Sequence, residues 1–372
     1  MKFSIEKEDL LKKIQHIYNI VPGKNTMPIL TNYLIEAEET TNTVKFTATD
    51  LEITVVAEFE ANISESGKVV VSAKNFNEII NSLPNTIVHM FDDEENFKIL
   101  CKNSKFSLHC AEVSQFPLIP QKDLQDTIEV DAQMFKKMIE KTSFAVSSEI
   151  NRPIFTGINW KMNADYQMMV ATDGKKIAEF KLFEKHEIPE QKEKVIPTKS
   201  LNFLDKVIVE DIPKVSVLIE SNRVMFAYGN YTVFTHIIEG NYPNYEKAIP
   251  VNNNNILIIN RNLLRDVVKR VSLLASEETL KVKFDITEES FSVHSEKREE
   301  GEANEQIEEY KYSGENLVIA FNYRYLLSIL NVIDSEEVEI RMGQANEPAL
   351  FFNTEKYENY EARFLLMPLR LA

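Results

Sequence analysis

The chain has 372 residues, 44% hydrophobic and 27% charged, and this length suits two or three domains. Its formal net charge of −16 argues against non-specific binding of the whole surface to nucleic acid or an anionic membrane. No apolar run reaches the roughly 18–20 residues of a membrane span. Polar and apolar residues alternate at the start of the chain, which lacks the apolar stretch of a secretory signal. Cys101 and Cys110 lack metal-ligand spacing and fit a reducing cytosol. We therefore expect a cytoplasmic protein.

One apolar spacing, with steps of two, five and four residues, occurs near the start and twice more along the chain. A step of two is typical of a strand with one buried face, and a step of four of a helix with one buried face. Each occurrence therefore predicts a strand, a short turn and a helix. The apolar positions are Phe3, Ile5, Leu10 and Ile14, then Ile128, Val130, Phe135 and Ile139, then Ile256, Ile258, Leu263 and Val267.

The same spacing recurs within each copy, so each copy consists of two similar halves. It is intact in the first and third copies and degraded in the middle one, where Leu204 supplies the helical apolar position. β-rich sequence such as 44–49 and 224–228 follows the helices and suits antiparallel strands. The second-half positions are Val69, Val71, Phe76 and Ile80, then Ile196 and Leu201, then Ile319, Phe321, Leu326 and Leu330.

Segments rich in proline or asparagine, at 117–120 and 250–255, are typical of linkers. We expect three domains, at 1–121, 126–249 and 254–372. The predicted fold class is α+β, in which three tandem copies of one domain have antiparallel sheets with helices gathered on one face. A repeat of this kind can serve simply as a scaffold.

The predicted helices have lysine and arginine on the side away from their apolar positions. Residues four apart share a helix face, and such a face is often merely solvated. Here, however, acidic residues concentrate elsewhere, at 92–95 and 296–309. We therefore predict a surface for a polyanion, with sequence-independent, salt-sensitive phosphate contacts. The residues are Lys12, Lys13, His16, Lys136, Lys137, Lys141, Arg265, Lys269 and Arg270 on the first helices, and Lys74, Lys199, Lys206 and Arg324 on the second.

Short motifs in order along the whole chain resemble the bacterial DNA sliding clamps, the β subunits of DNA polymerase III. The motifs are Met1–Ile5, Met27–Leu30, Thr47–Glu52, Arg152-Pro153 with Gly157, Ala171–Gly174, Gly240–Tyr245 and Leu366–Leu371. The resemblance implies a non-catalytic processivity factor, a head-to-tail homodimer closed into a ring whose helices line the hole around duplex DNA. It also implies contacts with the polymerase III catalytic subunit, the clamp loader and other proteins that carry a clamp-binding motif. Lys24 would lie at the DNA face.

The resemblance further implies a groove in which partners bind through a short peptide with apolar and aromatic residues. Many relatives have His and Arg where this chain has Lys175 and Lys176, and lysine does not replace a bidentate arginine. Asp173-Gly174 alone is equally typical of a tight turn. The matching positions are Phe155, Thr172, Gly174, Lys175, Lys176, Ile177, Pro243, Lys247, Leu366, Met367, Pro368, Leu369 and Arg370.

By the same resemblance, the first copy of one chain would meet the third copy of its partner in the ring. Phe106 and Leu108 would face apolar residues around Leu273 and Leu274, and Lys74 and Lys105 would pair with acidic residues. Ordinary core packing is the alternative interpretation of the four apolar positions.

No motif for catalysis, for a cofactor or for a metal is present. Gly23-Lys24 lacks the upstream glycine of a phosphate-binding loop, and there is no G-x-S-x-G or H-E-x-x-H. Two other classes stay open: an adhesive repeat scaffold, which should have a signal peptide, and a hydrolase that uses Asp50 or Asp173, which would need a second acid nearby. The equivalent repeat positions of these two aspartates favour a structural turn.

Overall fold

The computed structural model describes residues 1–23, 26–93, 95–186, 188, 190–297 and 300–371. In this part of the chain six α-helices of ten or eleven residues alternate with antiparallel strands. The helices are α1 (Lys7–Ile17), α2 (Ala73–Ser82), α3 (Ala132–Thr142), α4 (Thr198–Val207), α5 (Arg261–Val271) and α6 (Tyr323–Val332). The α+β prediction is confirmed.

Side-chain caps explain where several helices begin. The Ser72 hydroxyl accepts a hydrogen bond from the backbone N–H of Asn75 at 3.3 Å, and the Asn260 side chain accepts two, at 3.0 Å each. Asp131 does the same before α3, accepting from Met134 at 2.9 Å. Such side chains satisfy donors that the first helical turn leaves unpaired.

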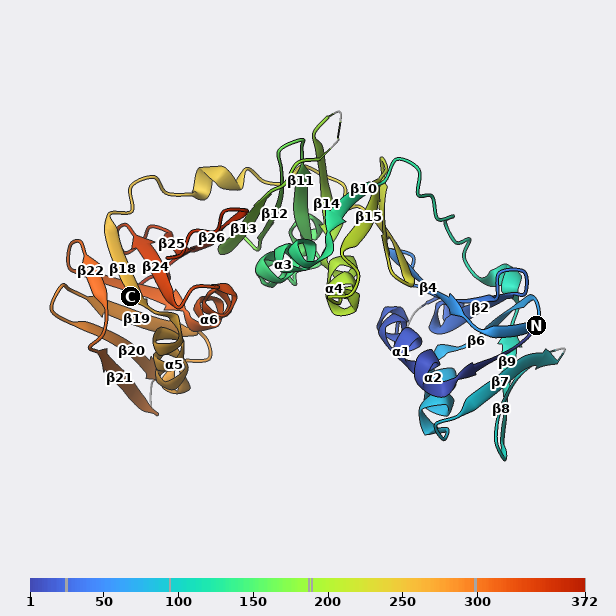
Figure 1. Ribbon diagram of the computed structural model, residues 1–372. Helices are drawn as coiled ribbons and strands as arrows, with labels where there is room; N and C mark the ends of the chain where they lie inside the picture. The colour runs from blue at the N-terminus through green and yellow to red at the C-terminus, as the bar shows by residue number, and fades with distance from the viewer. Residues whose placement is uncertain (24–25, 94, 187, 189, 298–299, 372) are drawn as a thin grey trace. The chain divides into compact units, whose positions relative to one another are not determined.

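The chain divides into two compact units, residues 1–136 with 199–237 (unit 1), and residues 137–198 with 238–372 (unit 2). This division does not follow the repeat copies, because strand pairing joins neighbouring copies: β17 pairs with β4 in unit 1, and β13 with β26 in unit 2. The predicted three-domain division stays a prediction. Figure 1 shows both units, and each is described by itself.

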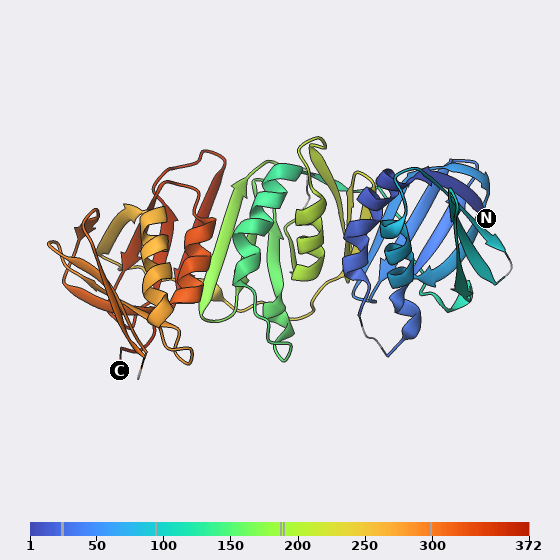
Figure 2. The ribbon, with the colours of Figure 1, turned by 90° about the horizontal axis from the view of Figure 1, so that it is seen from below.

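Unit 1 contains one sheet of 13 strands, in the order β10-β15-β16-β17-β4-β3-β2-β6-β9-β8-β7-β1-β5. Figure 2 shows α1 and α2, in blue, on one face of this sheet. The strands are β1 (Lys2–Glu6), β2 (Asn32–Glu38), β3 (Thr43–Thr49), β4 (Ile53–Glu60), β5 (Asn62–Glu65), β6 (Gly67–Ser72), β7 (Ile87–Asp93), β8 (Asn96–Cys101), β9 (Ser104–Ala111), β10 (Ile128–Asp131), β15 (Lys214–Ile219), β16 (Arg223–Tyr228) and β17 (Tyr231–His236).

Unit 2 contains sheets of nine and four strands, with α5 and α6 packed together. The nine-stranded sheet has β11 (Gly157–Met162), β12 (Tyr166–Thr172), β13 (Lys176–Phe183), β14 (Lys192–Pro197), β18 (Asn255–Asn260), β22 (Lys311–Ser313), β24 (Glu337–Met342), β25 (Ala349–Asn353) and β26 (Tyr360–Leu366). The four-stranded sheet has β19 (Lys281–Ile286), β20 (Phe291–Lys297), β21 (Gly301–Ile307) and β23 (Leu317–Asn322).

Alternation along β3 shows how the strands separate the core from the opposite face. Val44, Phe46 and Ala48 are fully buried on the helix side, where the Phe46 ring lies 5.4 Å from that of Phe76 in α2. Lys45 and Thr47, which alternate with them, belong to the other face. That face lines a hollow described below.

The third copy corrects one prediction by a single residue. Leu257 and Ile259 are the buried positions of its first strand, and Leu264 and Val268 are fully buried on its first helix. Val267, the fourth predicted position, is also buried as expected. The predicted Ile256, Ile258 and Leu263 are only partly buried. The spacing of two, five and four persists one residue later, because adjacent apolar residues at 256–259 and 263–264 left the register ambiguous.

Candidate nucleic-acid and partner-binding surfaces

Three of the predicted DNA-facing cations are exposed, and their ammonium groups have no partner among the described residues: Lys12 of α1, Lys206 of α4 and Lys269 of α5. His16, one turn after Lys12, is half-buried. Burial lowers the pKa of His16, and the positive charge of Lys206 lowers it further. His16 is therefore neutral at pH 7, and α1 has one fewer positive charge than the pattern of the other copies predicts.

Lys137 and Lys141 of α3 lie in a partly buried network with Asp334. The Lys137 ammonium lies 3.1 Å from one Asp334 carboxylate oxygen and donates to the Tyr360 hydroxyl at 2.9 Å, while Lys141 pairs with the other oxygen. Lys141 is only 7% exposed, so the prediction that it lies on a solvent-exposed face is wrong. The backbone carbonyl of Val332, the last residue of α6, accepts a further hydrogen bond from Lys141.

Burial and pairing act in opposite directions on the charges of this network. Burial lowers the pKa of Lys141, although Asp334 opposes the shift. Burial would raise the pKa of Asp334, but hydrogen bonds and charge from Lys141, with hydrogen bonds from Tyr360 and Lys137, hold it below its usual value. The carboxylate is therefore ionised at neutral pH and balances two cations. The network of Asp334 with the two lysines therefore stabilises local packing and does not present positive charge outward.

The other predicted cations are partly engaged within the chain. They are Lys13, which donates to Asn230 at 2.6 Å, Lys136, which donates to the Ile208 carbonyl at 3.2 Å, Lys74, 3.9 Å from Glu78, Lys199, paired with Asp50, Arg265, 3.4 Å from Asp266, and Arg270, which donates to Glu305 at 3.0 Å. A pair in which both partners are exposed, such as Lys74 with Glu78, exchanges partners at little energetic cost. Lys24 lies outside the described residues.

Asp50 and Asp173 form the same turn in copies one and two. The Asp50 carboxylate accepts from the backbone N–H groups of Glu52 and Ile53 at 3.0 and 2.9 Å, and Asp173 accepts the two equivalent bonds at 2.8 and 3.0 Å. Each also pairs with a lysine. These contacts explain both aspartates as turn formers and give the hydrolase alternative no support.

The turn requires a left-handed backbone at the residue after each aspartate. Gly174 has φ of 86° and Leu51 has φ of 80°. The glycine in copy two therefore suits a conformation that copy one adopts with strain. The distinctive features of copy two are the missing side chain and the two lysines that follow.

The predicted partner-peptide residues fall on neighbouring segments of unit 2. Lys176 pairs with Leu366 across β13 and β26, the Met367 N–H donates to the Lys175 carbonyl at 2.9 Å, and Leu369 bridges to Ala320. Ile177 belongs to a buried cluster with Tyr245 and Leu365. Phe155 is half-buried in a short 3₁₀ turn, Pro153–Thr156.

The two lysines of this set differ. Lys176 is 5% exposed, and its ammonium lies 2.5 Å from Asp173 and 4.3 Å from the centre of the Tyr325 ring. Its charge is thus satisfied inside the chain. Lys175, Lys247 and Arg370 are exposed, and within the described part of the chain their side chains have no partner, so these three are the available cations of the set.

The predicted interface residues lie beside strand edges. Ser104–His109 of β9 pairs only with β8, and β21 pairs only with β20 among the described strands. Leu273 is 80% exposed, whereas Leu108 is 8% exposed. Phe106 and Leu274 are partly buried, and Lys105 is exposed.

Sequence reasoning missed the groups that engage the predicted cations, above all Asp334, Tyr360 and Tyr325. They lie about 150 to 220 residues along the chain from their lysines, and periodicity within a helix gives no signal for such pairs. Within the described residues no group of three or more His, Cys, Asp or Glu side chains could hold a metal. No helix described here is long and apolar enough to cross a membrane.

Comparisons with known proteins agree along the chain. Models of the DNA polymerase III beta subunit match residues 1–120 (N-terminal domain), 129–244 (central domain) and 246–370 (C-terminal domain). The beta sliding clamp of Staphylococcus aureus is 30% identical over 358 residues and covers 94% of each chain. That of Staphylococcus epidermidis is 30% identical and covers 100% of this chain and 99% of its own.

Solved structures give the same result. The DNA polymerase sliding clamp from Bacillus subtilis superposes with a TM-score of 0.93 at 29% identity, and the DNA polymerase III subunit beta from Pseudomonas aeruginosa with 0.92 at 25%. Both comparisons cover all of each chain. The chain therefore belongs to the DNA polymerase III beta subunit family, the bacterial sliding clamps, which act in DNA replication without catalysing a reaction.

Proposed function

We propose that two copies of this chain join head to tail in a ring around duplex DNA and tether the polymerase III catalytic subunit during replication in the cytoplasm. The observation that carries the proposal is the pair of open strand edges, on β9 in the first copy and β21 in the third. An unpaired edge is a template for another strand. Joining β9 of one chain to β21 of the other would satisfy both edges.

Charge and apolar surface support this pairing. Lys105 is exposed on β9, while Glu302 is exposed on β21, so opposite charges lie on the two edges. Leu273 is 80% exposed beside Leu274, and an exposed leucine gains free energy when an interface covers it. Phe106 and Leu108 provide the apolar counterpart in the proposal, and Lys74 supplies a further cation.

The DNA-facing role rests first on Lys12, Lys206 and Lys269, whose ammonium groups have no recorded partner. Cations in exposed pairs, such as Lys74, would contribute by exchanging a weak ion pair for phosphate contacts. We leave Lys137 and Lys141 out of this role because Asp334 occupies both. Sequence-independent contacts would let a closed ring slide, while its topology would prevent escape.

Partner proteins, including the clamp loader, would bind through peptides at the set around β13 and β26. Met367 offers exposed apolar surface there, and methionine adapts to varied side chains. Lys175, Lys247 and Arg370 would meet carboxylates of the peptide. These features support recognition of short apolar segments that contain an acidic residue or a terminal carboxylate.

Retention on DNA tests the ring. The protein would be loaded onto nicked circular DNA by a matching clamp loader with ATP, and the circle then cut. We expect retention on the circle and loss from the linear product. Equal retention on both would contradict the ring.

Solution mass tests the interface separately. Light scattering should give twice the 43.0 kDa of one chain, and Leu273→Asp should shift the protein toward monomer. Val251→Asp is the matched control, because Val251 is 96% exposed and is not part of the proposed interface. A wild-type protein that stays monomeric at micromolar concentration would rule the proposal out.

A further inference from the structure

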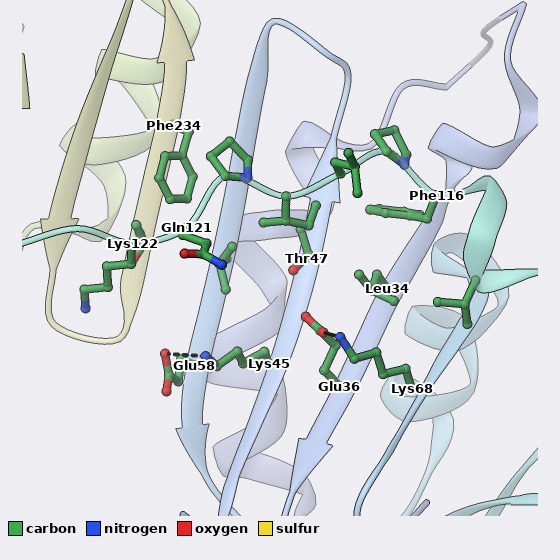
Figure 3. A pocket seen from close by; sticks show the side chains of 17 residues that line it. Leu34, Glu36, Lys45, Thr47, Glu58, Lys68, Phe116, Gln121, Lys122 and Phe234 are labelled. Atoms are coloured by element: carbon green, nitrogen blue, oxygen red, sulfur yellow. Dashed lines mark ion pairs between the residues drawn. The ribbon is translucent and has the colours of Figure 1, made fainter. Parts of the chain in front are cut away.

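A hollow of about 620 Å³ lies on the face of the unit 1 sheet opposite the helices. Strands β2, β3, β4 and β17 form its floor, and the segment after copy one, residues 113–122, forms a wall. Figure 3 shows this segment, from Phe116 to Lys122, crossing the strands. The volume is within the range of ligand-binding pockets.

Two side chains of the wall pack against the sheet. Phe116 is buried against Leu34 and Val70, with Ile119 partly buried beside them, whereas Leu118 is 99% exposed. Residues 117–122, with prolines at 117 and 120, make no hydrogen bond to any part of the chain that the structure describes. Its remaining N–H and C=O groups are therefore available to an extended chain lying alongside.

The floor contains a buried hydroxyl without a partner. Thr47 lines the hollow and is fully buried, and its Oγ1 atom has no hydrogen-bond partner. Buried polar groups are rarely left unpaired. Because no hydrogen bond fastens the wall above it, a small outward shift of the wall would bring this hydroxyl to an occupant.

The charge of the hollow differs in sign from that of the whole chain. Its lining has three lysines and two glutamates, in a chain of net charge −16. Lys45 lies 3.5 Å from Glu58, and Lys68 lies 2.5 Å from Glu36 (Figure 3). Lys122 is exposed and has no recorded partner, so it is the cation that a ligand carboxylate would meet.

The corresponding segment of unit 2 is fastened to its sheet. Tyr245 is buried in a cluster with Met168 and Ile177, and the Tyr242 hydroxyl donates to the Val170 carbonyl at 3.3 Å. The segment after copy one has no such aromatic anchors beyond Phe116. The two junctions therefore differ in how their segments are anchored to the sheet.

We propose that the unit 1 hollow is a second peptide-docking site, for an extended acidic and apolar segment of a partner protein. The occupant would pack an apolar side chain against Val56 and Phe234 and place a carboxylate beside Lys122. Its backbone would pair with residues 117–122. This site uses none of the residues proposed above for peptides at β13 and β26.

Fluorescence anisotropy with the full chain tests the site. The probe is a fluorescein-labelled peptide of alternating aspartate and leucine between glycines, and its control has lysine for each aspartate. We expect saturable binding of the acidic probe with a Kd between about 10 μM and 1 mM, and at least tenfold weaker binding of the control.

Variants locate the binding. Lys122→Glu, on an exposed side chain, should raise the Kd by about fivefold or more. Val56→Glu should do so too, and the strand should tolerate it, because the equivalent position of copy two is Glu179. Lys214→Glu is the matched control, an exposed lysine of unit 1 outside the hollow, and should change the Kd less than about twofold.

A third lysine separates this site from the one at β13 and β26. Because the site at β13 and β26 would also bind an acidic probe, the titrations are repeated in the Lys175→Glu background. There, Lys122→Glu should still raise the Kd by about fivefold or more. The proposal is overturned if Lys122→Glu leaves the Kd unchanged in that background, if Lys214→Glu weakens binding as much as Lys122→Glu, or if no saturable binding occurs. None of these outcomes depends on ring formation.

Discussion

Copies one and two place the same residue type at the same helix position and use it differently. Lys12 of α1 and Lys137 of α3 are 125 residues apart. Lys12 is exposed, whereas Lys137 is bound by Asp334 and Tyr360. A helix face is defined by local sequence, but a distant residue decides whether that face meets solvent. Equivalence in a repeat therefore predicts position better than it predicts exposure.

The largest expected effect of this difference is on stability. Asp334→Asn keeps the shape of the side chain but leaves Lys141 and Lys137 without their counter-charge. We expect a loss of about 3 kcal/mol in the free energy of unfolding, at the low end for a buried pair because the Asp334 side chain is 23% exposed. Urea unfolding followed by circular dichroism measures it. Glu78→Gln, in a pair with both partners exposed, should cost less than about 0.5 kcal/mol, and equal losses would contradict the assignment.

The ion pairs of Asp334 make the free energy of unfolding depend on pH. The pKa of Asp334 is lowered in the folded protein, so its contribution is present above the unfolded-state value of about 3.9. It is lost as the pH falls through the folded-state pKa. The difference between wild type and Asp334→Asn should therefore shrink over that acidic range. A difference that persisted there would indicate a loss of packing instead.

The next effect concerns DNA. The triple variant Lys12→Gln, Lys206→Gln and Lys269→Gln removes the three cations that have no recorded partner. If each contacts a phosphate, the slope of log affinity against log salt should fall by about 2.7. Anisotropy with a short labelled duplex at low salt measures it. Lys137→Gln is the control and should leave the slope unchanged, so a comparable fall with it would erase the contrast between the two copies.

The sequence predicts the elements that carry these lysines but not the contrast between them, and the failure has a physical cause. The strand and helix positions follow from apolar spacing, and Phe76, Leu201 and Leu326 are all fully buried as expected. Periodicity could not choose between Leu263 and Leu264, because both are leucine. It also gave no sign of the Asp334 network, because long-range pairing leaves no periodic trace.

The linkers show a second limit of the same kind. Proline and asparagine mark where the segments lie, but not how firmly each is held. Tyr245 fastens one segment through a buried cluster, whereas Leu118 projects into solvent from the other. Both are large residues in a proline-containing stretch, and only the sheet surface beneath them distinguishes their roles.

A smaller effect is expected in the turn that the two copies share. Gly174→Ala places a side chain at φ of 86° where nothing lies within 4 Å of the added carbon, so the cost is backbone strain alone, about 1 kcal/mol. Leu51→Gly relieves similar strain at φ of 80°, but its gain is reduced by the entropy of the unfolded glycine. Thermal unfolding should show opposite shifts, and shifts of the same sign would refute the equivalence of the turns.

The smallest expected effect comes from giving copy one the charge pattern of the others. His16→Lys restores a cation four residues after Lys12 and near Lys206. Because burial, and then Lys206, lowers the pKa of His16, wild type is neutral there above a pH of about 6.5. The variant should bind duplex DNA about two- to threefold more tightly at a pH of about 8, with a salt slope larger by about 0.9. Its advantage should shrink as the pH falls below the lowered pKa and His16 itself becomes charged.

His16→Gln is the control. Its side chain stays neutral throughout, so it should lack the increase in DNA affinity that wild type shows as the pH falls. If the affinity of wild type and His16→Gln rises equally as the pH falls, His16 does not face the DNA, and α1 contributes to binding through Lys12 without it.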